Sequence, residues 1–244
     1  MSTSRITMQD NNSNDLFQKN AYSQQVINIL MEWIMEGKFV MGDRLNANQI
    51  AQSLGISRMP VREALLDLEK RGLAESIPYA GMRLVVLSED DIKQIYLARK
   101  ALEPIAAQYA CRYVTKEDIQ RLEEIHKEYE RIVWDENAKP IDSYTQNRLF
   151  HFEIYKISRL NQICAMIEQL WDRLSFFKLI YGHDLLETPE SKAELVQTHR
   201  NYLDALIAKD EEKLFELIAG HTNKRIEDIP YSMDEYLGEE KRKD

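Results

Sequence analysis

Glycine, proline and cysteine are scarce in this chain of 244 residues, which has 8 Gly, 6 Pro and 2 Cys. So little glycine and proline excludes a collagen-like chain, and a hydrophobic content of 44% excludes a disordered one. Cys111 and Cys164 stand alone without a CxxC pair, so we expect buried free thiols rather than a disulfide or a metal cluster. No run approaches the ~20 apolar residues of a membrane helix, and the N-terminus lacks an apolar signal core. We therefore expect a cytoplasmic protein with two modest globular domains and no membrane partner.

Charge is unevenly spread along the chain, whose formal net charge is −9. Residues 1–87 carry nine basic and nine acidic side chains, whereas residues 88–244 carry 23 basic and 32 acidic ones. The overall excess of acid argues against a nucleic-acid partner, because phosphate binding depends on Lys and Arg. The neutral first part can nevertheless present a local basic face, while the acidic second part should stay away from phosphate. We therefore expect the two parts to have different roles.

The first part predicts a winged helix-turn-helix at residues 21–87. Residues 1–20 are polar and lack apolar periodicity, so we expect them to form a mobile arm. Helices are expected from Ser23 to Gly37, from Asn46 to Gly55, and from Ser57 to Arg71. Asn46 and Ser57 are expected to cap their helices, and Gly55 to end the second one. Two extended stretches, 73–77 and 82–87, are joined by a turn and form the expected two-stranded wing.

The second part shows only helical periodicity. Six segments can be marked, at 89–111, 115–135, 141–157, 160–181, 189–208 and 211–228. Short links between them predict an antiparallel bundle of six or seven helices, which we place at residues 88–230. Residues 231–244 are expected to form a charged, solvated tail. The expected fold class is therefore mostly α, with a small β wing in the first domain.

The third expected helix carries candidate DNA contacts. Its apolar stripe consists of Val61, Ala64, Leu65 and Leu68. Arg58 and Arg62 lie on another face without an acid at i±4, where they repel each other unless a polyanion neutralises them. A recognition helix presents its N-terminal residues to the major groove, which adds Ser57 and Met59 to the contact zone. The two arginines alone suit a solvated helix face equally well.

The motif around these arginines resembles a known family. Gly55-Ile-Ser-Arg-Met-Pro-Val-Arg-Glu-Ala-Leu65, with Gly42-Asp-Arg-Leu45 before it and Gly72-Leu73 and Gly81 after it, resembles the winged helix-turn-helix of the GntR family of bacterial transcription regulators. Met59 stands where the family pattern has Thr, and Asn48 aligns with a frequent Arg, so the operator sequence does not carry over. The resemblance implies DNA contacts from Arg58, Arg62 and the wing-tip Gly81, whose backbone can approach the groove closely.

Three of the five histidines fall on inward stripes of the second domain. His199 and His221 lie at similar distances on either side of a turn, so antiparallel helices bring them level. His151 shares a helix face with Asn147, four residues earlier. Three neutral imidazoles and an oxygen suit Zn²⁺ or Ni²⁺, but inward histidines are also common as hydrogen-bonded core residues, and the pattern supports both interpretations. The remaining histidines, His126 and His183, are expected on the surface.

The second domain carries a resemblance of its own. Arg99-x-x-Leu-Glu103, Asn147-Arg-Leu-Phe-His151, Leu160-Asn161, His199-x-x-x-Leu203 and His221 resemble the all-helical effector domain of the FadR branch of GntR regulators, and six helices point to its VanR-type subgroup. The resemblance implies a divalent metal on Asn147, His151, His199 and His221, and a small carboxylic acid or sugar acid that completes its coordination. Arg99 and Arg148 are candidate effector ligands, although Arg99 equally suits an ion pair with Glu103.

Asn147 stands where this branch usually has Asp. Four neutral ligands leave a divalent ion its full charge, which weakens metal retention and strengthens the attraction for an acid.

Together these features predict a ligand-responsive transcription regulator, not an enzyme, that binds a palindromic double-stranded DNA operator as a homodimer. The resemblance implies a repressor, in which the effector changes the placement of the two winged domains and thereby the operator affinity. One alternative is a metal-dependent hydrolase with a three-histidine site, although no general base is evident among the inward residues. The other is an architectural protein that binds DNA without sequence preference.

Overall fold

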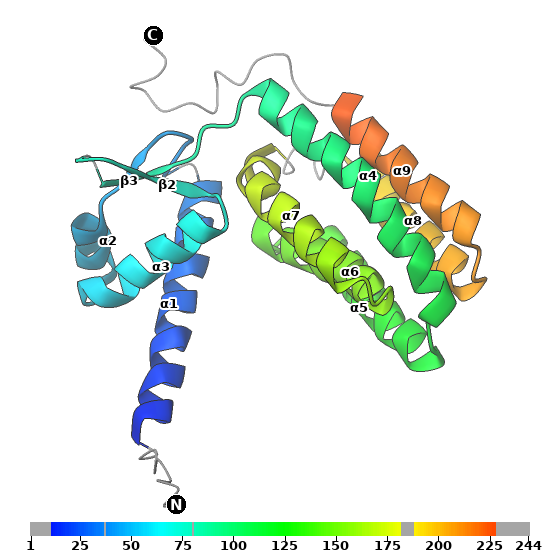
Figure 1. Cartoon of the computed structure of the whole chain (residues 1–244), viewed down its shortest axis with the longest axis horizontal. Helices are drawn as coiled ribbons and strands as arrows, with labels where there is room; N and C mark the ends of the chain where they lie inside the picture. The colour runs from blue at the N-terminus through cyan, green and yellow to red at the C-terminus, as the bar shows by residue number, and fades with distance from the viewer. Residues whose placement is uncertain (1–10, 37, 80, 182–187, 228–244) are drawn as a thin grey trace, which may run out of the picture.

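The computed structural model describes residues 11–36, 38–79, 81–181 and 188–227, which form a winged domain and a helical bundle (Figure 1). The winged domain comes first along the chain. Its elements are α1 (Asn11–Met35), β1 (Arg44–Leu45), α2 (Ala47–Leu54), α3 (Arg58–Lys70), β2 (Ala74–Ile77) and β3 (Gly81–Leu84). The mostly α fold class is therefore confirmed.

The turn between α2 and α3 is set by local chemistry. The Asn46 side chain accepts hydrogen bonds from the backbone N–H groups of Asn48 and Gln49, at 2.9 and 3.3 Å, and so caps α2 as expected. Gly55 ends α2 with a left-handed φ of 65°, which glycine adopts without steric cost. Ser57 occupies the N-cap position of α3, but its side chain makes no capping hydrogen bond, contrary to expectation.

Two boundaries differ from the sequence prediction. Helix α1 begins at Asn11, so residues 11–20 are helical rather than part of an arm, because no Gly or Pro interrupts the chain before residue 37. The wing has three antiparallel strands in the order β1-β3-β2, not two. The additional strand was missed because two residues are too short to show an alternating pattern. Residues 1–10 and the expected tail at 231–244 lie outside the described residues.

The bundle consists of six helices among the described residues, as predicted. They are α4 (Glu89–Tyr113), α5 (Lys116–Trp134), α6 (Pro140–Ile157), α7 (Asn161–Tyr181), α8 (Pro189–Ile207) and α9 (Glu211–Glu227). Ser88 and Thr115 start α4 and α5 with reciprocal capping bonds to Asp91 and Asp118. None of the described helices is both long and apolar enough to cross a membrane.

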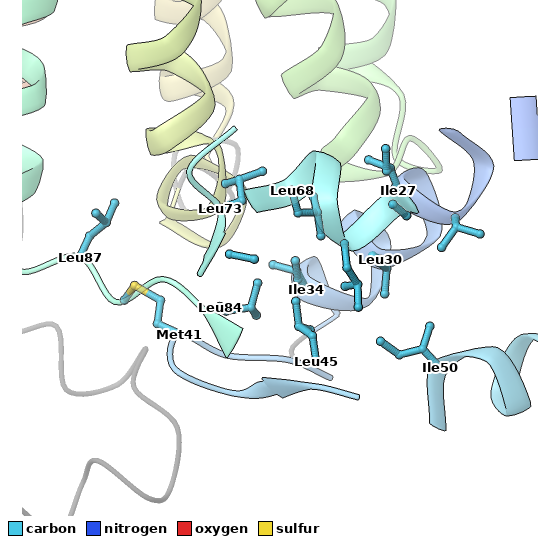
Figure 2. Close-up of a cluster of buried hydrophobic side chains, with 14 of the residues drawn as sticks. Ile27, Leu30, Ile34, Met41, Leu45, Ile50, Leu68, Leu73, Leu84 and Leu87 are labelled. Carbon is cyan, nitrogen blue, oxygen red and sulfur yellow. The ribbon is translucent and has the colours of Figure 1, made fainter. Parts of the chain in front are cut away.

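Each domain has its own apolar core, and helix α7 contributes to both. Figure 2 shows the core of the winged domain, where Leu30, Leu68 and Leu84 are fully buried. Leu174 of α7 is fully buried in this same cluster, and Leu170 packs against it. Ile167 and Trp171 of α7 are buried instead in the core of the bundle. The two domains are therefore joined by shared packing as well as by the chain.

Both cysteines are free thiols, as expected. Cys111 is buried, and burial raises the pKa of its thiol to about 11. Cys164 is only half-buried, and its Sγ donates to the backbone oxygen of Tyr155.

Leu174→Ala tests the shared packing. Because the side chain is fully buried between the domains, we expect the free energy of unfolding to fall by about 2–5 kcal/mol in urea titrations. Leu97→Ala on α4 is the matched control, since 55% of Leu97 is exposed and the change should stay within about 0.5 kcal/mol. Equal effects of the two substitutions contradict the shared core.

Candidate functional site

Helix α3 presents one apolar and one polar face, as its sequence predicts. Val61, Ala64, Leu65 and Leu68 are all buried. Arg58, Met59 and Arg62 are exposed, and neither arginine has an ion-pair partner among the described residues. A pair of exposed, unneutralised arginines at the start of a recognition helix is suited to DNA.

The other three predicted DNA contacts, Asn48, Ser57 and Gly81, are exposed as well. Asn48 and Ser57 are exposed, and the hydroxyl of Ser57 is not used to cap its helix. Gly81 begins β3 with a φ of 86°, a conformation that a residue with a side chain rarely adopts. The structure therefore leaves all six predicted positions accessible.

In the bundle, the structure brings three of the four predicted metal ligands together. Asn147 Oδ1 of α6 lies 3.1 Å from His199 Nε2 of α8, and the rings of His151 and His199 are 5.2 Å apart between centroids. His151 and His199 are buried. His221 of α9 is half-buried, and its ring lies 6.4 Å from that of Tyr202. Asn147, His151 and His199 thus lie together, whereas His221 is placed beside Tyr202, whose ring lies 5.8 Å from that of His151 and 6.4 Å from that of His199.

These donors fit a metal ion in part. Two imidazoles that share one ion have ring centroids about 5 Å apart, given metal–nitrogen bonds of about 2 Å, and the His151–His199 pair matches this spacing. The amide oxygen of Asn147 is a further neutral donor. Within the described ranges, however, no three His, Cys, Asp or Glu side chains form a group that could hold an ion.

His126 was expected on the surface, but it is buried. Only 6% of it is exposed, and its ring lies 6.1 Å from Phe150 and 6.4 Å from His199. Its polar neighbours in the sequence concealed its position on the buried stripe of α5, where Leu122 precedes it by four residues and Tyr129 follows by three. His183 lies outside the described residues.

Burial favours the neutral form of the His199 and His126 imidazoles. It holds the pKa of His199 well below its ordinary value, and the neighbouring His151 and His126 act in the same direction. Burial likewise lowers the pKa of His126. A neutral imidazole has a free nitrogen lone pair, which is the form that binds metals.

Arg99 forms the ion pair with Glu103 that the sequence had left as an alternative. Arg99 Nε lies 2.5 Å from Glu103 Oε1, and both side chains are buried. The indole N–H of Trp171 donates to Oε1 at 2.6 Å, and the hydroxyl of Tyr155 donates to Oε2 at 3.0 Å. Burial and the Glu103 carboxylate raise the pKa of Tyr155, so this hydroxyl keeps its proton. The same hydroxyl lies 3.3 Å from His151 Nδ1 and so links the ion pair to the histidines.

Arg148 is also ion-paired, but part of its guanidinium group has no hydrogen-bond partner among the described residues. Its Nη2 lies 2.8 Å from Asp172 and 3.4 Å from Glu168, both on α7. Its Nη1 is buried without a hydrogen-bond partner among the described residues, as are Arg99 Nη1 and the hydroxyl of Tyr144. Burial raises the pKa of Tyr144, and the nearby Arg148 opposes this rise. Neither Tyr144 nor Trp171 and Tyr155, the other two partners of Glu103, were identified from the sequence.

These side chains form one interior group, which we call the buried polar site. Its members are Arg99, Glu103, Tyr144, Asn147, Arg148, His151 and His199. It contains buried N–H and O–H groups that have no hydrogen-bond partner among the described residues. It also contains neutral imidazole nitrogens and an amide oxygen, which can coordinate a metal ion. Such a group can bind the oxygen atoms of an anionic or hydroxylated small molecule.

Comparison with known proteins assigns a family to each domain. Residues 22–84 match the bacterial regulatory proteins of the gntR family, and residues 94–224 match the FCD domain.

Two relatives cover most of the chain. The HTH-type transcriptional regulator McbR of Escherichia coli is 31% identical over 188 residues, which cover 77% of this chain and 83% of McbR. The uncharacterised HTH-type regulator YdhC of Bacillus subtilis is 27% identical over 215 residues, which cover 88% of this chain and 93% of YdhC. These relatives are regulators rather than enzymes, as the sequence predicted.

The fold gives the same assignment. The solved structure of E. coli McbR (YncC) has a TM-score of 0.66 at 30% identity and covers 84% of this chain and 95% of that one. A GntR regulator from Rhodococcus sp. RHA1, at 21% identity, has a similar fold, with a TM-score of 0.64, and covers 86% of this chain and 97% of that one. The chain therefore belongs to the GntR family of bacterial transcription regulators, with a gntR-type winged helix-turn-helix followed by the FCD effector domain of the FadR branch.

Proposed function

We propose that this regulator is a repressor that binds a palindromic operator as a homodimer and releases it when a small carboxylate or sugar acid enters the buried polar site. The observation that carries the proposal is the set of unpaired donors on Arg99, Arg148 and Tyr144. A buried donor without an acceptor costs about 1–3 kcal/mol. The oxygen atoms of an acid can accept from these donors and remove that cost.

The charge of the site also favours an acid once a metal is bound. Glu103 and Asp172 already neutralise Arg99 and Arg148, so the arginines supply hydrogen bonds rather than net charge. A Zn²⁺ or Ni²⁺ ion held by Asn147, His151 and His199, with His221 as the fourth expected ligand, would supply positive charge for an anionic effector. The arginines would then orient the remaining oxygen atoms of the acid.

Helix α7 connects this site to the winged domain. Trp171 donates to Glu103, and Asp172 pairs with Arg148. Leu170 and Leu174, on an adjacent face of the same stretch of α7, pack in the core of the winged domain. Arg173 lies against the turn after α3, where a Cβ on Gly72 would come within 3.1 Å of its side chain. A shift of α7 on effector binding would therefore move the DNA-binding surface.

Arg62→Ala tests the recognition helix. The side chain is exposed, so the fold should persist, while the loss of a base contact should weaken operator binding by about 1–3 kcal/mol and relax the sequence preference. Fluorescence anisotropy at fixed salt, on a duplex selected from genomic fragments, measures both effects.

Lys70→Ala is the matched control for Arg62→Ala. This substitution removes the same charge from an exposed position at the opposite end of α3, so it should change the affinity for the operator much less. Unchanged affinity and preference in Arg62→Ala contradict the assignment. Equal binding of all duplexes by the wild type favours the architectural alternative.

Asn147→Asp tests the metal and the effector together. The added carboxylate should bind Zn²⁺ at least about tenfold more tightly, while the lower net charge of the site should weaken binding of the acid. Calorimetry measures the metal first and then a panel of mono- and dicarboxylates and sugar acids.

Asn201→Asp adds the same charge at an exposed position on α8 and should leave both affinities unchanged. If Asn147→Asp also changes neither affinity, Asn147 does not face the ion.

Trp171→Phe tests the route through α7. It removes the donor to Glu103 but keeps an aromatic ring beside Arg99, so the two binding sites should each remain functional. The ratio of the operator affinity without the acid to that with the acid measures the coupling between the two sites. We expect this ratio to be at least about fivefold smaller in Trp171→Phe than in the wild type, which is within the usual range of such coupling. Trp134→Phe, at a partly exposed position on α5, is the control. A wild-type ratio in Trp171→Phe contradicts this route.

A further inference from the structure

A groove lies between the recognition helix and the wing. It has a volume of about 710 Å³ and is bounded by α3, the start of α2, β1 and the β2–β3 hairpin. Apolar side chains of Leu66, Ile77 and Met82 line it together with the polar side chains of Arg44, Gln49 and Arg62. Arg62 and Gly81, which also lines the groove, were among the DNA contacts expected from the sequence, whereas Arg44 was not.

Arg44 is held at this groove without a neutralising partner. In the sheet, Arg44 pairs directly with Arg83 of β3, and Arg83 pairs on its other side with Glu75 of β2. Glu75 accepts from Arg83 Nε at 2.7 Å, whereas Arg44 is exposed and makes no ion pair with any described residue. Like charges placed directly opposite each other in a sheet are destabilising. The row formed by Arg44, Arg83 and Glu75 across the three strands therefore has a net charge of +1, which no described residue balances.

The position of the groove indicates which molecule can balance the charge of Arg44. A major groove is bordered on both sides by sugar–phosphate backbone, so with α3 in the major groove the hollow between α3 and the wing faces one of these two strands. A strand presents phosphate oxygens, which suit Arg44 and Arg62, and deoxyribose faces, which suit the apolar side chains. The mixed lining of the groove matches this chemistry.

We propose that the groove seats the backbone of one DNA strand and that Arg44 binds a phosphate there. The inference rests on the proposed placement of α3 and adds a contact from β1 that is independent of base sequence. Such a contact contributes to affinity on every duplex and to its dependence on salt, but it does not contribute to preference for the operator.

The test compares Arg44→Ala with Arg83→Ala, which removes the same charge from the neighbouring strand. Anisotropy titrations at several salt concentrations use the selected operator and a random duplex of equal length. Arg44→Ala should lower the slope of log affinity against log salt by about 1 on both duplexes. Arg83→Ala should leave the slope unchanged, and Arg44→Lys, which keeps the charge, should restore it. Circular dichroism and thermal melting establish that each variant is folded.

The other outcomes separate this proposal from the proposed function. A wild-type slope in Arg44→Ala, with Arg62→Ala still defective, overturns the seat for the strand and leaves the recognition helix in place. A loss confined to the operator also overturns it, because Arg44 would then read bases. If neither Arg44→Ala nor Arg62→Ala weakens binding, the whole DNA surface, and with it this proposal, is wrong.

Discussion

Helix α7 is the constraint on which the relation between the two domains depends. A helix turns once in 3.6 residues, so neighbouring residues point in different directions and residues four apart point the same way. Leu170 and Leu174 therefore share one side, in the winged core, while Trp171 points into the bundle. Because both cores are close-packed, α7 cannot move against one domain without repacking the other. A change at the buried polar site that displaced α7 would therefore also disturb the packing of the winged domain.

The interior next to α7 is unusually polar for a core. Glu103 is well satisfied, since it accepts from Arg99, Trp171 and Tyr155. Arg99 is not, because one of its terminal nitrogens is buried without an acceptor. Apolar side chains of similar volume would often stabilise such an interior equally well or better. A polar group retained at this cost, with donors left over, is better suited to binding than to stability.

Local features of this fold were predictable from the sequence, and long-range ones were not. The Asn46 cap, the Gly55 stop and the buried stripe of α3 each depend on residues within one or two helical turns. The two-residue strand β1 exists only through its pairing with β3, and Trp171 meets Glu103 across 68 residues of chain. His126 is an intermediate case. Its spacing from Leu122 and Tyr129 did place it on the buried face, but its charged neighbours suggested solvent.

The placement of arginines reconciles an acidic protein with a DNA-binding role. In the bundle, exposed arginines are largely paired with acids, as Arg112 is with Glu211 and Arg131 with Glu128. In the winged domain, Arg44, Arg58 and Arg62 have no such partner among the described residues. The net charge of the whole chain is therefore a poor guide to DNA binding. Salt screens exposed charges over about 8–10 Å, so an acid that pairs with an arginine of the bundle farther away than this does not weaken the positive field in front of α3. The surplus acid of residues 88–244 instead repels phosphate from the bundle, which leaves the winged face as the surface that DNA can approach.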